Sequence, residues 1–161
     1  MMDEKGYIGQ RLSVLVGLNV SGIGHAADML TLQFGALKQV TNLRGKVKQV
    51  GEWALHIQCK WRLEHAGEVV LTQNDLAGSD TDAHNATARL EERLVRHEPT
   101  SVQEILAGEF GNVSIVMSRG LTLHIVANGT ADEEDWRFFA PGADVPHLVI
   151  EGGRIEPGSL G

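Results

Sequence analysis

The sequence has few cysteines and no long apolar run, and each shortage excludes a class of protein. The single cysteine, Cys59, excludes an internal disulfide framework and a zinc site built only from cysteines. The chain contains no run of about 18 apolar residues, so we expect no transmembrane helix. The pattern of a signal peptide, a basic segment followed by an apolar one, is not visible in the sequence, so we expect no signal peptide. We therefore expect a cytoplasmic protein with no membrane partner.

Positive charge is also scarce, which narrows the choice of partners. The chain has 14 Lys and Arg residues against 21 Asp and Glu residues, for a formal net charge of −7. Binding nucleic acid without sequence preference requires positive groups that neutralise phosphates, so we expect no nucleic-acid partner. The length of 161 residues suits a single domain over residues 1–161. The Gly- and Pro-rich residues from about 152 to 161 predict a flexible C-terminal tail.

The spacing of apolar residues predicts which segments form helices and which form strands. The expected elements, in chain order, are an N-terminal helix over 8–16, strands within 20–71, two central helices over about 83–97 and 100–108, and strands within 113–151. Asp82 is the expected N-cap of the first central helix, and Glu92 and Arg96 are expected to form an ion pair on it. Separate blocks of strands and helices favour an α+β fold with a mainly antiparallel β-sheet.

The clearest pattern is an alternation of apolar and polar residues between Trp53 and Glu64. The apolar positions are Trp53, Leu55, Ile57, Cys59, Trp61 and Leu63. Such strict alternation predicts one long strand with a buried face and a solvent-exposed face. Cys59 belongs to the buried row, so we interpret it as a small core residue rather than a metal ligand. No metal site and no cofactor are expected.

The polar row of this strand is the candidate binding surface. It consists of His56, Gln58, Lys60 and Arg62, whose side chains stand about 7 Å apart along one face. Arg137, in a later Trp-Arg pair, is expected to lie over the same face. Three interpretations remain open: the solvated face of a sheet, a protein interface, or a groove in which Arg62 binds a carboxylate or phosphate.

Two weaker patterns in the sequence suggest other functions. Residues 22–27 match the G-x-G-x-x-A form of the dinucleotide-binding motif, but the following residues have a strand pattern, which favours glycines in a twisted strand. His56, His124 and His147 are candidate general bases for a small enzyme. No nucleophile or metal motif in the sequence accompanies any of them.

The alternating segment Trp53–Leu63, with Ala27–Phe34 before it and Trp136–Phe139 after it, resembles an uncharacterised bacterial domain family. Members of that family are small single-domain proteins of unknown function, so the resemblance implies no catalytic residues. The function we expect is a non-catalytic binding or interaction module for a small anionic ligand or a protein partner. A homodimer formed through the sheet face is one arrangement of such a module, and a small enzyme with a histidine general base is the alternative.

Overall fold

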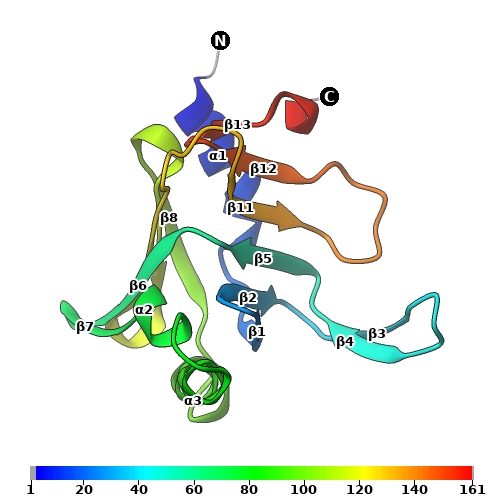
Figure 1. Ribbon diagram of the computed structural model, residues 1–161, viewed down its shortest axis with the longest axis vertical. Helices are drawn as coiled ribbons and strands as arrows, with labels where there is room; N and C mark the ends of the chain where they lie inside the picture. Colours follow the sequence, from blue (N-terminus) through cyan, green and yellow to red (C-terminus); the bar gives the residue numbers. More distant parts are fainter. Residues whose placement is uncertain (1–2, 161) are drawn as a thin grey trace.

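The computed structural model describes residues 3–160 and has the predicted α+β fold (Figure 1). The first antiparallel sheet has the order β1 (Val20–Ala26), β2 (Met29–Phe34), β5 (Trp53–Ile57), β11 (Glu134–Phe139), β12 (Leu148–Glu151) and β13 (Arg154–Ile155). The second has the order β7 (Glu68–Thr72), β6 (Lys60–His65), β10 (Leu121–Val126), β9 (Val113–Met117) and β8 (Val102–Ala107). A two-stranded arm, β3 (Lys38–Thr41) and β4 (Val47–Val50), extends from the first sheet (Figure 1).

The helices differ in detail from those that the sequence predicts. They are α1 (Glu4–Leu12), α2 (Gln73–Leu76) and α3 (Asp80–Glu91), the last continued by a π-helical turn (Glu92–Arg96). Ser79, not Asp82, is the N-cap of α3. The Ser79 hydroxyl accepts from the Asp82 N–H at 3.1 Å, and the Asp82 carboxylate accepts from the Ser79 N–H at 3.3 Å. The prediction of Asp82 was wrong because Asp82 is the third helical residue of a capping box.

The π-helical turn changes the predicted ion pair. Glu92 and Arg96 were expected to pair at the spacing of an α-helix. A π-helix instead closes its hydrogen bonds over five residues. Arg96 Nε accordingly meets Glu91 Oε1 at 2.8 Å.

The second central helix, expected over residues 100–108, is a strand. Residues 102–107 form β8 and pair with β9 at the edge of the second sheet. The Ser101 N–H donates to the Ser118 hydroxyl at 3.0 Å, a contact with a distant turn rather than a helix cap. The helix predicted from the capping-box pattern was wrong because tertiary pairing with β9 outweighs a local preference for helix.

The two sheets share one apolar core, and the predicted alternation describes it well. Leu55, Ile57, Cys59, Trp61 and Leu63 are all buried, and Trp53 is half-buried. The alternating polar residues are half-buried or exposed: His56, Gln58, Lys60 and Arg62. The assignment of the two faces is therefore confirmed.

The continuity of the long strand is not confirmed. At Gln58 and Cys59 the chain leaves the first sheet and enters the second, so that β5 and β6 belong to different sheets. The backbone N–H groups of both residues donate to the carbonyl of Asp135, at 2.8 and 3.0 Å. The buried Asp135 carboxylate accepts from the N–H groups of Asn128, at 2.9 Å, and Gly153, at 2.7 Å. Asp135 thus holds the junction at which the predicted polar row is divided.

The C-terminal segment begins with an ordered pairing. Arg154 and Ile155 form β13 beside β12, and the Ile155 N–H donates to the Glu4 carboxylate at 2.8 Å. Ile155 is buried. The flexibility of residues 152–161 stays a prediction, and this pairing indicates where the segment is anchored. Within residues 3–160, no helix is both long enough and apolar enough to cross a bilayer.

Candidate functional site

The structure brings two of the predicted site residues together and separates two others from them. Strand register aligns Gly24, Thr31, His56, Arg137 and Val149 in a line across the first sheet. His56 and Arg137 are therefore direct cross-strand neighbours on its outer face. Lys60 and Arg62 lie on β6 in the second sheet, where Arg62 pairs with His124. The predicted row is consequently not one continuous site.

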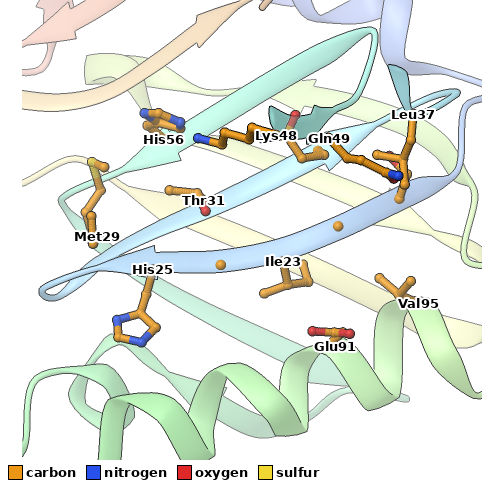
Figure 2. A pocket seen from close by; sticks show the side chains of 15 residues that line it. Ile23, His25, Met29, Thr31, Leu37, Lys48, Gln49, His56, Glu91 and Val95 are labelled. Carbon is orange, nitrogen blue, oxygen red and sulfur yellow. The ribbon is translucent and has the colours of Figure 1, made fainter. Parts of the chain in front are cut away.

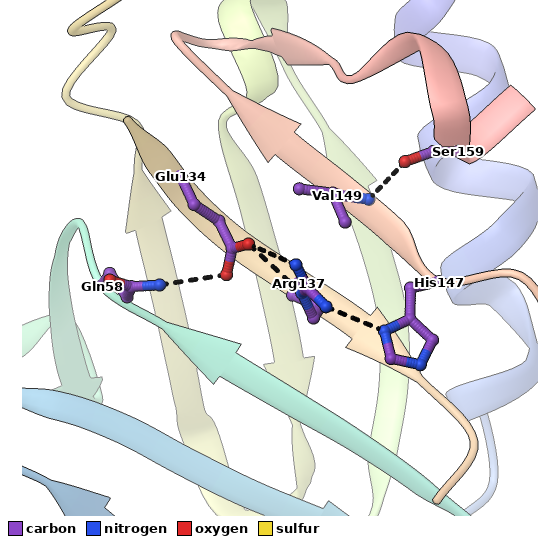
Figure 3. Close-up of polar contacts among 6 residues, drawn as sticks. All are labelled: Gln58, Glu134, Arg137, His147, Val149 and Ser159. Atoms are coloured by element: carbon purple, nitrogen blue, oxygen red, sulfur yellow. Dashed lines mark hydrogen bonds and ion pairs between the residues drawn. The ribbon is translucent and has the colours of Figure 1, made fainter. Parts of the chain in front are cut away.

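Arg137 is held by protein groups (Figure 3). Its Nη2 donates to Glu134 Oε1 at 2.7 Å, and its Nη1 donates to His147 Nδ1 at 3.1 Å. Gln58 Nε2 donates to the other oxygen of the same carboxylate, Glu134 Oε2, at 3.0 Å. The fork of the guanidinium is engaged within the protein, so Arg137 positions its neighbours rather than offering two open donors to a ligand.

Two histidines flank Phe139 on this face. The Phe139 ring meets His56 edge to face, with centroids 4.8 Å apart, and stacks on His147 at 4.7 Å. Burial lowers the pKa of both histidines below the usual 6.5, and the next contribution comes from Lys48 for His56 and from Arg137 for His147. Both rings are therefore neutral at pH 7. Because Arg137 can only donate, His147 Nδ1 accepts and Nε2 carries the proton.

A groove of about 560 Å³ lies over β1 and β2, beside the arm (Figure 2). Gly22 and Gly24 form part of its floor, and Lys48 and His56 line it. A Cβ at Gly24 would stand 2.9 Å from Thr31 Oγ1, so the Thr31 side chain lies over this glycine. The G-x-G-x-x-A match lies mainly within β1 and its following turn, with no helix after it, so the interpretation as strand glycines is confirmed.

The arm gives this groove a local positive charge. Residues 29–51 contain four basic side chains, Lys38, Arg44, Lys46 and Lys48, and no Asp or Glu. Glu91, from α3, is the carboxylate on the opposite wall of the groove. Reasoning from periodicity missed Lys48 as a site residue, although the absence of acidic residues over this stretch was visible in the sequence.

The outer face of the second sheet carries a different polar cluster. Ser114 on β9, His124 on β10 and Glu64 on β6 are linked by contacts of 2.7 Å, from Ser114 Oγ to His124 Nδ1, and 3.3 Å, from His124 Nε2 to Glu64 Oε1. Arg62 Nε donates to Glu64 Oε2 at 2.8 Å. Sequence reasoning missed Ser114 and Glu64. Ser114 faces His124 across the β9–β10 hairpin, so the turn between these strands was the signal that could have paired them. Glu64 lies on β6, far along the chain, and no spacing rule connects it to the hairpin.

Metal and thiol chemistry have little support in the part of the chain that the structure describes. Among residues 3–160, no group of three or more His, Cys, Asp or Glu residues is arranged to hold a metal ion. Cys59 is buried, and burial raises the pKa of its thiol to about 12. The Cys59 thiolate is thus scarce at neutral pH, in agreement with a role in the core.

Comparison with known proteins gives no match: no family model, curated protein or solved structure is similar to this chain at a significant level. The resemblance to an uncharacterised bacterial family stays a prediction.

Proposed function

We propose that the first sheet serves as a non-catalytic binding module, which takes a small anionic ligand in the groove between the arm and its outer face. The observation that carries the proposal is the juxtaposition of Lys48 and His56 along a groove whose floor is bare at two glycines. Lys48 supplies the main charge contact, and His56 supplies a ring nitrogen.

Electrostatics favour an anion at this place. In a protein of net charge −7, an anionic ligand must be drawn by a local positive field. The acid-free stretch over residues 29–51 provides that field, and the exposed Lys48 presents it to the groove. Carboxylates and phosphates are the anions that a lysine and a histidine can both contact. Arg137 supports the site indirectly by holding Glu134 and His147 in place.

Binding should strengthen in mildly acidic solution. The pKa of His56 is lowered, so His56 gains its proton only below the usual range near 6.5. A protonated His56 adds a second positive charge to the groove for a bound anion. We therefore expect tighter binding at pH 5.5 than at pH 7.5 for an anion whose own charge is constant over that range.

A thermal-shift series with inorganic sulfate, inorganic phosphate and citrate tests the proposal. An anion present at about ten times its Kd should raise the Tm of the wild type by about 3–6 °C. Lys48→Gln should reduce this shift strongly. Lys60→Gln is the matched control, because it removes an exposed lysine from the predicted row on the other sheet, and it should leave the shift unchanged.

Two outcomes would contradict the proposal. One is the absence of a shift with every anion in the series. The other is an equal loss of the shift in Lys48→Gln and Lys60→Gln, which would indicate screening of general charge rather than a site. A loss confined to Lys60→Gln would instead favour the original assignment to Lys60 and Arg62.

Two broader expectations belong to the same proposal. A cytoplasmic location agrees with a single reduced and buried cysteine. A protein partner or a second copy of the chain would use the arm, since Leu43 at its tip is fully exposed next to Arg44. Sedimentation velocity at micromolar concentration distinguishes monomer from dimer. A monomer at every concentration would contradict the expectation of a homodimer.

A further inference from the structure

The cluster on the second sheet contains a serine, a histidine and a carboxylate connected in series. Ser114 Oγ lies 2.7 Å from His124 Nδ1, and His124 Nε2 lies 3.3 Å from Glu64 Oε1. The three side chains come from adjacent strands β9, β10 and β6, and strand register places Ser114 and Arg62 on either side of His124. The order nucleophile, base, acid is the one that acyl-transfer enzymes use.

The hydrogen bonds of the cluster leave His124 in a form that can accept a proton. Glu64 can only accept when ionised, so the ring nitrogen facing it, Nε2, carries the hydrogen. Nδ1 is then an acceptor, and the Ser114 hydroxyl donates to it. The Arg62 hydrogen bond is the main cause that lowers the pKa of Glu64, which keeps this carboxylate ionised.

A shallow groove of about 350 Å³ lies at this cluster. Ser114, His124 and Arg62 line it together with two exposed apolar side chains, Leu106 and Val126. Within residues 3–160, Arg62 Nε is engaged by Glu64, whereas its Nη nitrogens have no hydrogen-bond partner in the protein. Arg62 therefore brings open donors to the groove that holds the serine.

We propose that Ser114 is a nucleophile activated by His124 and that the protein hydrolyses small carboxylic esters in this groove. The apolar side chains accommodate a short acyl or aryl group, and the open Arg62 Nη donors in the same groove supply positive charge for the oxygen that becomes negative. Glu64 is a positioning residue, which orients His124. This activity is independent of the anion site, because it lies on the other sheet.

The reaction balances without an additional reagent. Ser114 Oγ bonds to the ester carbonyl carbon, its proton passes to His124 Nδ1, and the carbonyl π electrons move to the oxygen. When the C=O bond re-forms, the bond to the alcohol oxygen breaks and that oxygen takes the proton from Nδ1. Water then attacks acyl-Ser114 in the same way, which releases a carboxylic acid and restores the serine hydroxyl.

Covalent labelling of the wild-type protein with a fluorophosphonate tests the nucleophile directly. We expect one adduct by intact mass spectrometry, mapped to Ser114 by peptide sequencing, and none in Ser114→Ala. His124→Gln should slow the labelling by about 100-fold or more. Ser13→Ala is the control, because Ser13 is an exposed serine that donates to the Gln10 carbonyl, and this variant should be labelled like the wild type.

Hydrolysis of p-nitrophenyl acetate supplies a second readout, in which Ser114→Ala should lose the Ser114-dependent rate. Glu64→Gln keeps the shape of the side chain but removes the charge that stabilises protonated His124. It should move the acid limb of the pH–rate profile to lower pH. A purely structural role would lower the rate without moving the profile.

The proposal is overturned if the folded wild type gives no adduct at Ser114, or if Ser114 is labelled equally fast in His124→Gln. The first of these two results is obtained on the wild-type protein, so it does not depend on the folding of a variant. In either case the cluster of Ser114, His124 and Glu64 would have a structural role, as a polar network on the face of the sheet.

Discussion

The outer faces of the two sheets use the same residue types in a different order. On the first sheet the contacts run from Glu134 to Arg137 to His147. On the second they run from Arg62 to Glu64 to His124. The histidine of the first face therefore meets a cation, whereas the histidine of the second meets a carboxylate.

The middle residue of each series decides what the histidine can do. Arg137 donates to His147, so this ring accepts at Nδ1, and burial together with the nearby Arg137 charge lowers the pKa of His147. Glu64 Oε1 lies 3.3 Å from His124 Nε2, so this ring faces a carboxylate rather than a cation. The first face thus holds neutral rings beside a cationic groove, and the second aligns a serine, a histidine and a carboxylate. The amino-acid composition of the two outer faces would not distinguish one face from the other.

The largest effect is expected at the junction between the sheets. Asp135→Ala leaves the N–H groups of Asn128, which is half-buried in this contact, and Gly153, which is buried in it, without their acceptor. We expect the free energy of unfolding to fall by about 3–6 kcal/mol, measured by urea denaturation. Asp135→Asn keeps one carbonyl oxygen and should lose less. Equal small losses in both variants would show that the Asp135 carboxylate contributes little to the stability of this junction.

The next largest effect tests whether the two sheets are stabilised as one unit. Ile57 in the first sheet and Leu63 in the second are completely buried in the shared core. Ile57→Ala and Leu63→Ala should each lower the free energy of unfolding by about 2–5 kcal/mol in a single cooperative transition. Two separate transitions in either variant would mean that the sheets unfold independently, and a loss below about half a kcal/mol would contradict the burial of that position.

The smallest expected effect is a pH dependence that belongs to the first face. The pKa values of His56 and His147 are lowered in the folded protein, so the unfolded chain binds protons first as the pH falls. Stability from these groups is therefore fully present above about pH 6.5, declines as the pH falls below it, and levels off below the lowered pKa values. Urea denaturation between pH 7.5 and 5 measures this slope.

A pair of histidine variants sharpens the pH experiment. His147→Gln should make stability less dependent on pH than it is in the wild type. His65→Gln, at an exposed position on the second sheet, is the control and should leave the slope unchanged. If His65→Gln flattens the slope as much as His147→Gln, the effect does not come from the first face.

The amino-acid sequence determined the class of fold and the two faces of the central segment. Strict alternation from Leu55 to Leu63 separates buried from wet side chains because successive residues of an extended chain point in opposite directions. That rule is local, and it holds through the crossing between sheets. The same local reasoning failed over residues 100–108, where pairing with β9 overrides a helix-capping pattern.

Only the tertiary structure decided which polar residues meet. Whether Arg62 belongs with His56 or with His124 depends on the crossing at Gln58 and Cys59, which the Asp135 carbonyl holds from a strand far along the chain. Glu64 likewise becomes a neighbour of His124 only through the pairing of β6 with β10, whereas Ser114 and His124 face each other across a single hairpin. The solvent-exposed faces could be predicted from periodicity. The contacts between polar side chains on those faces could not, because pairing between strands from distant parts of the chain is non-local.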